Sequence, residues 1–152
     1  MDSYTERFSE VHYPLIVVPP VVESPAGEQI SAYVSLQGYH RAVAVLTLGA
    51  IAATGTVQVR FLQATTTAGA SAKGIPTTAT QDKITTVLTT VDANSVVVIE
   101  LRTEELDVDN GFDCVALAYD VDTDTVALSA IVFGTVPSYP PVSAAGYNEI
   151  VG

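Results

Sequence analysis

The chain has 152 residues, and its 17 acidic side chains outnumber its 6 basic ones, which gives a formal net charge of −11 at pH 7. This length is typical of one domain, which can bury a sufficient core without a disulfide or a metal. The basic residues are scattered singly along the chain. We therefore expect binding neither to nucleic acid, which depends on Lys and Arg contacts to phosphate, nor to an anionic membrane.

The single cysteine, Cys114, excludes an intrachain disulfide framework and is compatible with a reducing compartment. The first apolar run, Leu15 to Val18, is too short for the hydrophobic region of a secretory signal. The longest mostly apolar run, Ala42 to Ala53, falls short of the roughly 20 residues that a membrane-spanning helix needs. We therefore expect a soluble protein.

The first 29 residues contain four prolines, Pro14, Pro19, Pro20 and Pro25. Proline cannot donate to the hydrogen-bond ladder of a central strand and favours extended chain. We expect residues 1–29 to form an extended N-terminal arm. Two alternatives stay open for it: a disordered tail, or an arm that packs on a neighbouring subunit, which its apolar content would suit.

The middle of the chain, residues 30–136, alternates apolar and polar side chains in short runs. Strands are predicted over residues 30–37, 41–48, 57–61, 84–90, 95–102, 112–119 and 125–133. The 41–48 segment (RAVAVLTL) is apolar on both faces, which predicts a central strand. Residues 65–81 are predicted as a long loop, and residues 120–124 as a hairpin loop. About seven short strands predict an all-β fold, a single β-sandwich or jelly-roll-like domain.

Residues 137–152 are also rich in proline, with Pro137, Pro140 and Pro141. They predict an extended C-terminal arm. We expect the two arms to supply the contacts to protein partners. The candidate interaction residues are the aromatic and aliphatic side chains Tyr4, Phe8, Tyr13, Leu15, Ile16, Val17, Val18, Tyr139 and Tyr147.

The acidic stretch 104–113 (EELDVDNGFD) suggests a calcium loop because its carboxylates alternate. An EF-hand loop needs glycine at position 6 and glutamate at position 12. Counted from Glu105, these positions hold asparagine and alanine, so the motif fails. A calcium site of another kind, near Asp107, Asp109 and residues 120–124, stays open.

A turn accounts for more of these residues. Thr103 is expected to cap a short helical turn that carries Glu104 and Glu105 where the helix dipole favours negative charge. Asn110 and Gly111 form a pair that favours a turn. The carboxylates expected to be solvated are Asp107, Asp109 and Asp113.

Signatures of catalysis are missing from the sequence. It has no nucleophile elbow, no glycine-rich phosphate loop and no His-Glu-x-x-His motif. Its two histidines, His12 and His40, and its one cysteine are too few to predict a zinc site. Cys114 shares a strand face with Phe112 and Ala116, which predicts a buried, inert thiol. We expect no enzyme activity, no cofactor and no metal.

Three tyrosines could form a platform for glycan binding. They are Tyr33, Tyr39 and Tyr119, and the chain has no tryptophan to support them. Tyrosines on strands more often pack against their neighbours. A glycan-binding β-sandwich module is therefore kept only as an alternative function.

Three motifs resemble those of small structural proteins of tailed-bacteriophage virions. They are the aromatic-His-Arg strand at residues 39–41, the Gln-Ala-Thr-x-x-x-Gly-x-x-Ala-Lys loop at 63–73 and the Glu-Leu-Asp-x-x-x-Gly-Phe turn at 105–112. The ending that begins at Pro137 is also similar. The resemblance implies a non-enzymatic structural part of a virion.

Size, fold and charge then favour a head decoration (cement) protein, which binds the outside of the capsid shell and stabilises it. The expected partners are the major capsid protein and copies of the chain itself, as a homotrimer. The expected location is the capsid surface of the virion, after synthesis in the host cytoplasm. A component of the tail or the head–tail neck is the alternative within the virion.

Overall fold

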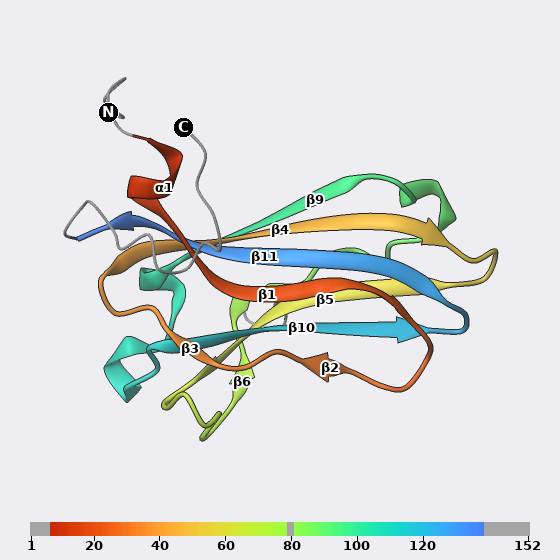
Figure 1. Ribbon diagram of the computed structural model, residues 1–152. Coiled ribbons are helices and arrows are strands. Elements are labelled where there is room, and N and C mark those ends of the chain that lie inside the picture. The colour runs from red at the N-terminus through yellow and green to blue at the C-terminus, as the bar shows by residue number, and fades with distance from the viewer. Residues whose placement is uncertain (1–6, 79–80, 139–152) are drawn as a thin grey trace.

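In the computed structural model, two antiparallel sheets lie face to face (Figure 1). The structure describes residues 7–78 and 81–138. Sheet A has the strand order β1–β11–β4–β9, and sheet B has the order β2–β10–β5–β6, with β3 also pairing with β10. The all-β sandwich predicted from the sequence is confirmed.

The strands of sheet A are long and those at the edges of sheet B are short. Sheet A contains β1 (His12–Glu23), β4 (Tyr39–Ile51), β9 (Val96–Arg102) and β11 (Val126–Pro137). Sheet B contains β2 (Gln29–Ile30), β3 (Val34–Ser35), β5 (Thr56–Ala64), β6 (Lys73–Gly74) and β10 (Cys114–Asp122). The strands β7 (Pro76–Thr78) and β8 (Gln81–Asp82) form a separate pair.

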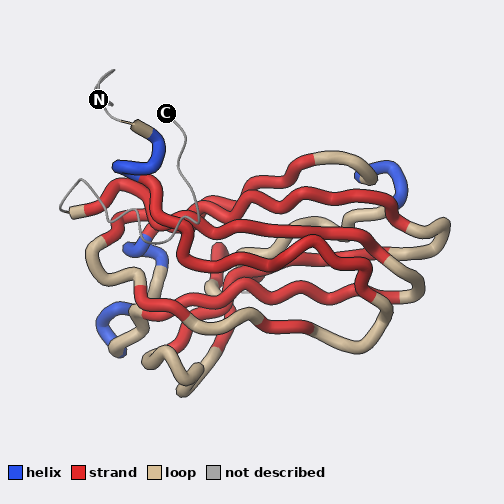
Figure 2. Tube along the Cα trace, in the orientation of Figure 1, coloured by secondary structure: helices blue, strands red, loops and turns tan. Residues whose placement is uncertain are grey.

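Short helical turns lie at the ends of the sandwich (Figure 2). They are α1 (Phe8–Val11) and the 3-10 turns η1 (Thr90–Asp92), η2 (Thr103–Glu105) and η3 (Val108–Asn110). None of the helices in the described residues is long and apolar enough to cross a bilayer.

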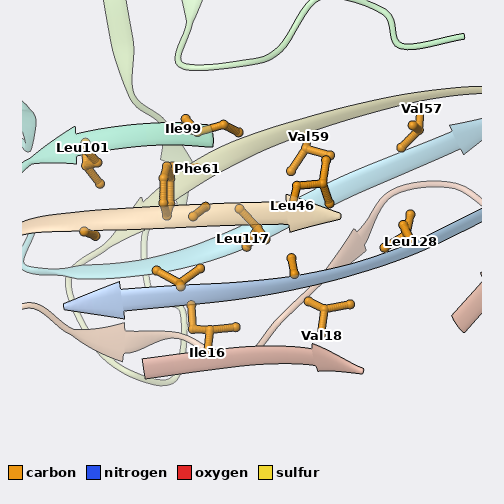
Figure 3. Packing of buried hydrophobic residues seen from close by; sticks show 14 of the residues in the cluster. Ile16, Val18, Leu46, Val57, Val59, Phe61, Ile99, Leu101, Leu117 and Leu128 are labelled. Atoms are coloured by element: carbon orange, nitrogen blue, oxygen red, sulfur yellow. The ribbon is translucent and has the colours of Figure 1, made fainter. Parts of the chain in front are cut away.

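The core lies between the two sheets, where apolar side chains from both sheets point toward one another (Figure 3). In β4 and β9 alternate residues are buried, as the period of two requires. In β4, Ala44, Leu46 and Leu48 are buried, and in β5, Val59 and Phe61 are fully buried.

The predicted N-terminal arm is wrong for residues 12–23, which form the edge strand β1 along β11. Proline is tolerated on an edge strand and at bulges, where no ladder hydrogen bond is lost. The register of β1 shifts between Pro14 and Ile16 and again between Val18 and Val21, the interval that contains Pro19 and Pro20. The sandwich therefore begins well before residue 30.

Three other predicted elements differ from the structure. The strand over 30–37 is present only at β2 and β3; between them, the Ser31 hydroxyl accepts a hydrogen bond from the backbone N–H of Leu117. Residues 84–90 form no strand; they lie beside β5 through isolated bridges at Ile84 and Leu88 and through hydrogen bonds between Thr85 and Val59. The long loop over 65–81 contains β6 and β7.

The stretch 104–113 is a turn, as predicted, but its cap differs. Thr103 lies within η2, and its hydroxyl donates to the carbonyl of His40. Glu105 accepts a hydrogen bond of 2.7 Å from the backbone N–H of Arg102. Gly111 has φ of +81° and closes η3, which explains the need for glycine there.

Candidate protein-interaction surface

The outward side of sheet A is apolar. Its inward residues form the core, so the alternate residues point away from sheet B. We call the resulting surface the apolar face, and it consists of Val17, Val43, Val45, Val96, Val98, Ile131 and Phe133. Antiparallel sheets usually present polar side chains to water on this side. The composition of this face is therefore unusual for a surface.

The strand register places four of these side chains in one row across the whole sheet. Val17 pairs with Ile131, Ile131 with Val45, and Val45 with Val98. Val17 is 62% exposed, Ile131 38% and Val98 54%. A continuous apolar strip therefore crosses all four strands.

Charged side chains occur on this face only at one end. Among the outward residues of the four strands, they are Arg41, Glu100 and Arg102. Arg41 and Arg102 are direct cross-strand neighbours, an arrangement of like charges that is unfavourable by itself. Arg102 lies 3.3 Å from Glu104. We call this the arginine end.

At the same end, α1 places an aromatic ring over the face. The Phe8 ring packs edge-on against Phe133, with 5.4 Å between ring centroids, and against His12 at 4.2 Å. Phe8 is nevertheless 57% exposed. The ring therefore forms a raised apolar contact point.

The opposite end of the face is hollowed. An open hollow of about 360 Å³ lies over β1, β11 and β4. Its lining includes Pro20, Val22, Thr47, Gly49, Ala127 and Ser129. A side chain at Gly49 would place its Cβ only 3.0 Å from that of Ala127, so this part of the surface stays low. We call this the hollow end.

The structure places the candidate interaction residues in different settings. Ile16 and Val18 are buried in the core at 6% and 7% exposure, so their prediction as contacts to a partner is wrong. Leu15 is partly buried against the core. Tyr13 stacks on Tyr39, with 6.5 Å between ring centroids.

Phe8 and Val17 are exposed and belong to the surface described above. Tyr4, Tyr139 and Tyr147 lie outside the described residues. Sequence reasoning missed the rest of the apolar face, on β4, β9 and β11. The signal was present, because residues 41–48 are largely apolar at both alternating sets of positions and residues 96–99 are all apolar.

Two ion pairs join the acidic stretch 104–113 to the segment 73–83, which precedes β9 in the chain. Lys73 contacts Asp107 at 2.5 Å, and Lys83 contacts Glu105 at 2.6 Å. The buried Gln63 accepts from the backbone N–H of Asp107. Asp107 is thus not simply solvated, and Asp113 also has partners in Gln37 and Cys114. The carboxylates of Glu105, Asp107 and Asp113 therefore stabilise the local structure of this turn.

These contacts change the acidities of the two carboxyl groups. Burial raises the pKa of Glu105, but the Arg102 N–H and the Lys83 ammonium outweigh it, and the pKa is lowered. Hydrogen bonds from Lys73 and then Asn110 lower the pKa of Asp107. In the described part of the chain, no group of three or more His, Cys, Asp or Glu side chains is placed to hold a metal ion.

The remaining candidates for chemistry are separate from one another. Burial, followed by the neighbouring Asp113, raises the pKa of the Cys114 thiol to about 11. A thiol at such a pKa is a poor nucleophile near neutral pH. Tyr33 packs against Gly69 and Tyr39 against Gly134, so both rings have packing roles.

A second groove, of about 310 Å³, lies between the facing edges of the two sheets. β1 lines one side of it, and residues 29–34 line the other. Tyr119 closes it by donating a hydrogen bond of 3.2 Å to Glu23, and burial followed by that carboxylate raises the pKa of Tyr119. The groove is thus a seam of the sandwich.

Comparisons with known proteins gave no match: neither a protein-family model nor a curated protein nor a solved structure is significantly similar to the chain. The resemblance to bacteriophage virion proteins therefore stays a prediction from the motifs.

Proposed function

We propose that the chain is a non-enzymatic structural protein of a bacteriophage virion, which binds the outside of the capsid shell and stabilises it as a decoration protein. The observation that carries the proposal is the apolar face. A surface of this composition suits contact with another protein. The proposed partners are the major capsid protein and copies of the chain itself.

The energetics support assembly through this face. Removing apolar surface from water contributes about 25 cal/mol per Å². Val17, Val96 and Val98 each expose more than half of their surface, and they lie on one sheet with Ile131. Contiguous apolar patches of several hundred Å² are uncommon on monomers and mark interaction sites.

The charge supports a position outside the shell. A chain with net charge −11 is repelled by packaged DNA, so an inner position would be unfavourable. The arms contribute to the proposal only through Tyr4, Tyr139 and Tyr147, which lie outside the described residues.

The deciding experiment is quantitative mass spectrometry of purified virions, combined with electron microscopy of the particles. We expect a copy number comparable to that of the capsid protein, and density on the outer surface. A few copies at a single vertex would favour the tail or neck instead. Absence from the particle would refute the proposal, and saturable glycan binding would then favour the glycan-binding module.

A functional measurement complements the copy number. Adding the purified chain to particles that lack it should raise the temperature at which the shells release DNA. Serum albumin at the same concentration serves as the control. Binding without any gain in shell stability would contradict a stabilising role.

A further inference from the structure

We propose that the apolar face packs against the same face of a second copy of this chain, with the strands of the two copies running in opposite directions. The resulting dimer has a two-fold axis that lies between the two sheets near Ile131 and Val45. The inference rests on the proposed function in one respect, because that function assigns this face to assembly. It adds the partner and the geometry.

The distribution of charge over the surface is compatible with a second copy as the partner of the apolar face. Two molecules with net charge −11 repel each other over most of their surfaces. The centre of the apolar face carries no charged side chain, so two copies approach there at the least electrostatic cost. The row of Val17, Ile131, Val45 and Val98 then meets its own counterpart.

The area of the face lies near the lower limit for a specific interface. Four strands about 4.8 Å apart, each about seven residues long at 3.4 Å per residue, give a footprint of roughly 460 Å² per copy. Two copies then bury about 900 Å², close to the roughly 1,000 Å² that a specific interface should clear. Two stacked sheets about 10 Å apart repeat the packing already present inside the sandwich.

The shape of the face selects reversed strands. A two-fold axis perpendicular to the strands places the arginine end of one copy over the hollow end of the other. The raised Phe8 and Phe133 rings then meet the low surface at Gly49, Ala127 and Ser129. Large side chains that face small ones pack without voids. The face is therefore complementary to itself.

The charges at the two ends agree with this orientation. At the hollow end, η1 places Asp92 close to Gly49, which accepts a hydrogen bond from the backbone N–H of Asn94, and Asp124 lies in the turn before β11. Reversed strands bring Arg41 and Arg102 of one copy toward these carboxylates of the other. Parallel strands would instead place two arginine pairs together, which is unfavourable.

Pairing through strand edges is less suitable on the β1 side. Pro14, Pro19 and Pro20 remove backbone donors from this edge, and two register shifts interrupt it. A dimer that joined β9 to β9 would leave Val17 exposed. A substitution at Val17 therefore distinguishes packing of the faces from pairing of the edges.

The test is the mass of the purified full-length chain in solution, measured by analytical ultracentrifugation over a wide range of concentrations. We expect twice the chain mass of 15.9 kDa. Val98→Lys and Val17→Lys each place a charge in the interface and should weaken dimerisation about tenfold or more. The matched control is Val108→Lys in η3, because Val98 and Val108 are both 54% exposed. Circular dichroism establishes that each variant is folded.

Several outcomes would overturn the dimer. They are a monomer at every concentration, a trimer, an effect of Val17→Lys no larger than that of Val108→Lys, or equal weakening by all three substitutions. Dimer loss in both face variants, with the control unchanged, supports it.

A second pair of variants tests the orientation. Ser129→Phe fills the hollow and should weaken the dimer, because Phe8 of the second copy can no longer enter. Adding Phe8→Ala to Ser129→Phe should restore much of the affinity, since the smaller side chain again fits. If the double variant is as weak as Ser129→Phe alone, the reversed packing is refuted.

Failure of the dimer and failure of the proposed function are distinguishable. A monomeric chain that is abundant on virions would refute the dimer alone. A dimeric chain that is absent from virions would refute the decoration role alone.

Discussion

The outer faces of the two sheets differ in what they present and in what covers them. On sheet A, large side chains such as Val98 and Ile131 remain exposed. On sheet B, three outward residues of β10 are small, and Cys114, Ala116 and Ala118 are buried at 3% exposure or less. The outer surface of sheet B also carries polar side chains, such as Gln58, Arg60 and Asp120, and its small apolar residues are covered within the described chain.

The cover of sheet B consists of contacts that cross over β10. This strand lies between β5 on one side and β2 and β3 on the other. Arg60 of β5 reaches Glu28 beside β2, at 2.7 Å. The Tyr33 ring lies beside Gly69, where an added Cβ would be only 2.8 Å from the ring. The small residues of β10 leave room for both contacts.

The comparison shows how cover and side-chain size are related. Where the chain covers its own sheet, alanine and cysteine allow the covering groups to approach. Where it supplies no cover, valine, isoleucine and phenylalanine keep a surface that gains free energy when another protein covers it. The difference supports the assignment of sheet A, and not sheet B, to assembly.

Matched truncations on the two outer faces should show the largest difference. Leu62 on β5, 5% exposed, and Ile131 on β11, 38% exposed, both point outward. Leu62→Ala should lower the free energy of unfolding by about 2–4 kcal/mol, because it leaves a cavity. Ile131→Ala should cost less than about 1 kcal/mol in dilute solution, where the chain is monomeric.

Urea denaturation at low protein concentration measures both values. Similar losses for the two variants would show that the outer faces are covered to the same extent, which would remove the contrast between them.

Larger side chains test the same contrast by adding volume to the two outer faces, where the truncations remove it. Ala116→Phe must fit beneath the cover of sheet B, and overpacking of this kind costs about 1–3 kcal/mol. Val45→Phe points into solvent on sheet A and should change the monomer by less than about 0.5 kcal/mol. Thermal unfolding monitored by circular dichroism compares the pair. A stable Ala116→Phe would mean that this face is open.

The sandwich itself was predictable because the alternation of buried and exposed residues is local. The strong segments over 41–48, 95–102 and 125–133 correspond to β4, β9 and β11. β1 was missed because its prolines exclude a central strand, whereas an edge strand tolerates them. Edge position depends on strand order, which no local pattern encodes.

The apolar face was not predictable for a related reason. An apolar segment on both alternating sets of positions, such as 41–48, indicates burial on both sides. In the structure, one side of β4 faces the core and the other faces solvent. Which side receives a cover depends on the path of the loops and on partners. The reverse error affects Ile16 and Val18. Their apolar side chains were predicted to contact a partner, but the core of their own chain buries them.

Acidification should weaken the attachment of the acidic turn and leave the apolar face unaffected, and this is the smallest effect. The folded pKa of Glu105 lies below its ordinary value of 4.5, so its contribution to stability is fully present above that pH. It is lost as the pH falls through the lower folded pKa. Asp107 behaves in the same direction below its ordinary value of 3.8. The centre of the apolar face has no carboxylate to titrate.

The partner of Glu105 provides the test. Lys83→Met removes the ammonium group and should reduce the loss of unfolding free energy between about pH 5 and pH 3 by no more than about 1 kcal/mol, because the pair is partly exposed. Arg41→Met also removes one positive charge, but from the arginine end of sheet A, and should leave the pH profile nearly unchanged. If both variants reduce the pH dependence of the unfolding free energy equally, net charge, and not the Lys83–Glu105 contact, causes the loss of stability in acid. The attachment of the acidic turn to Lys83 would then contribute no more to stability than any surface charge.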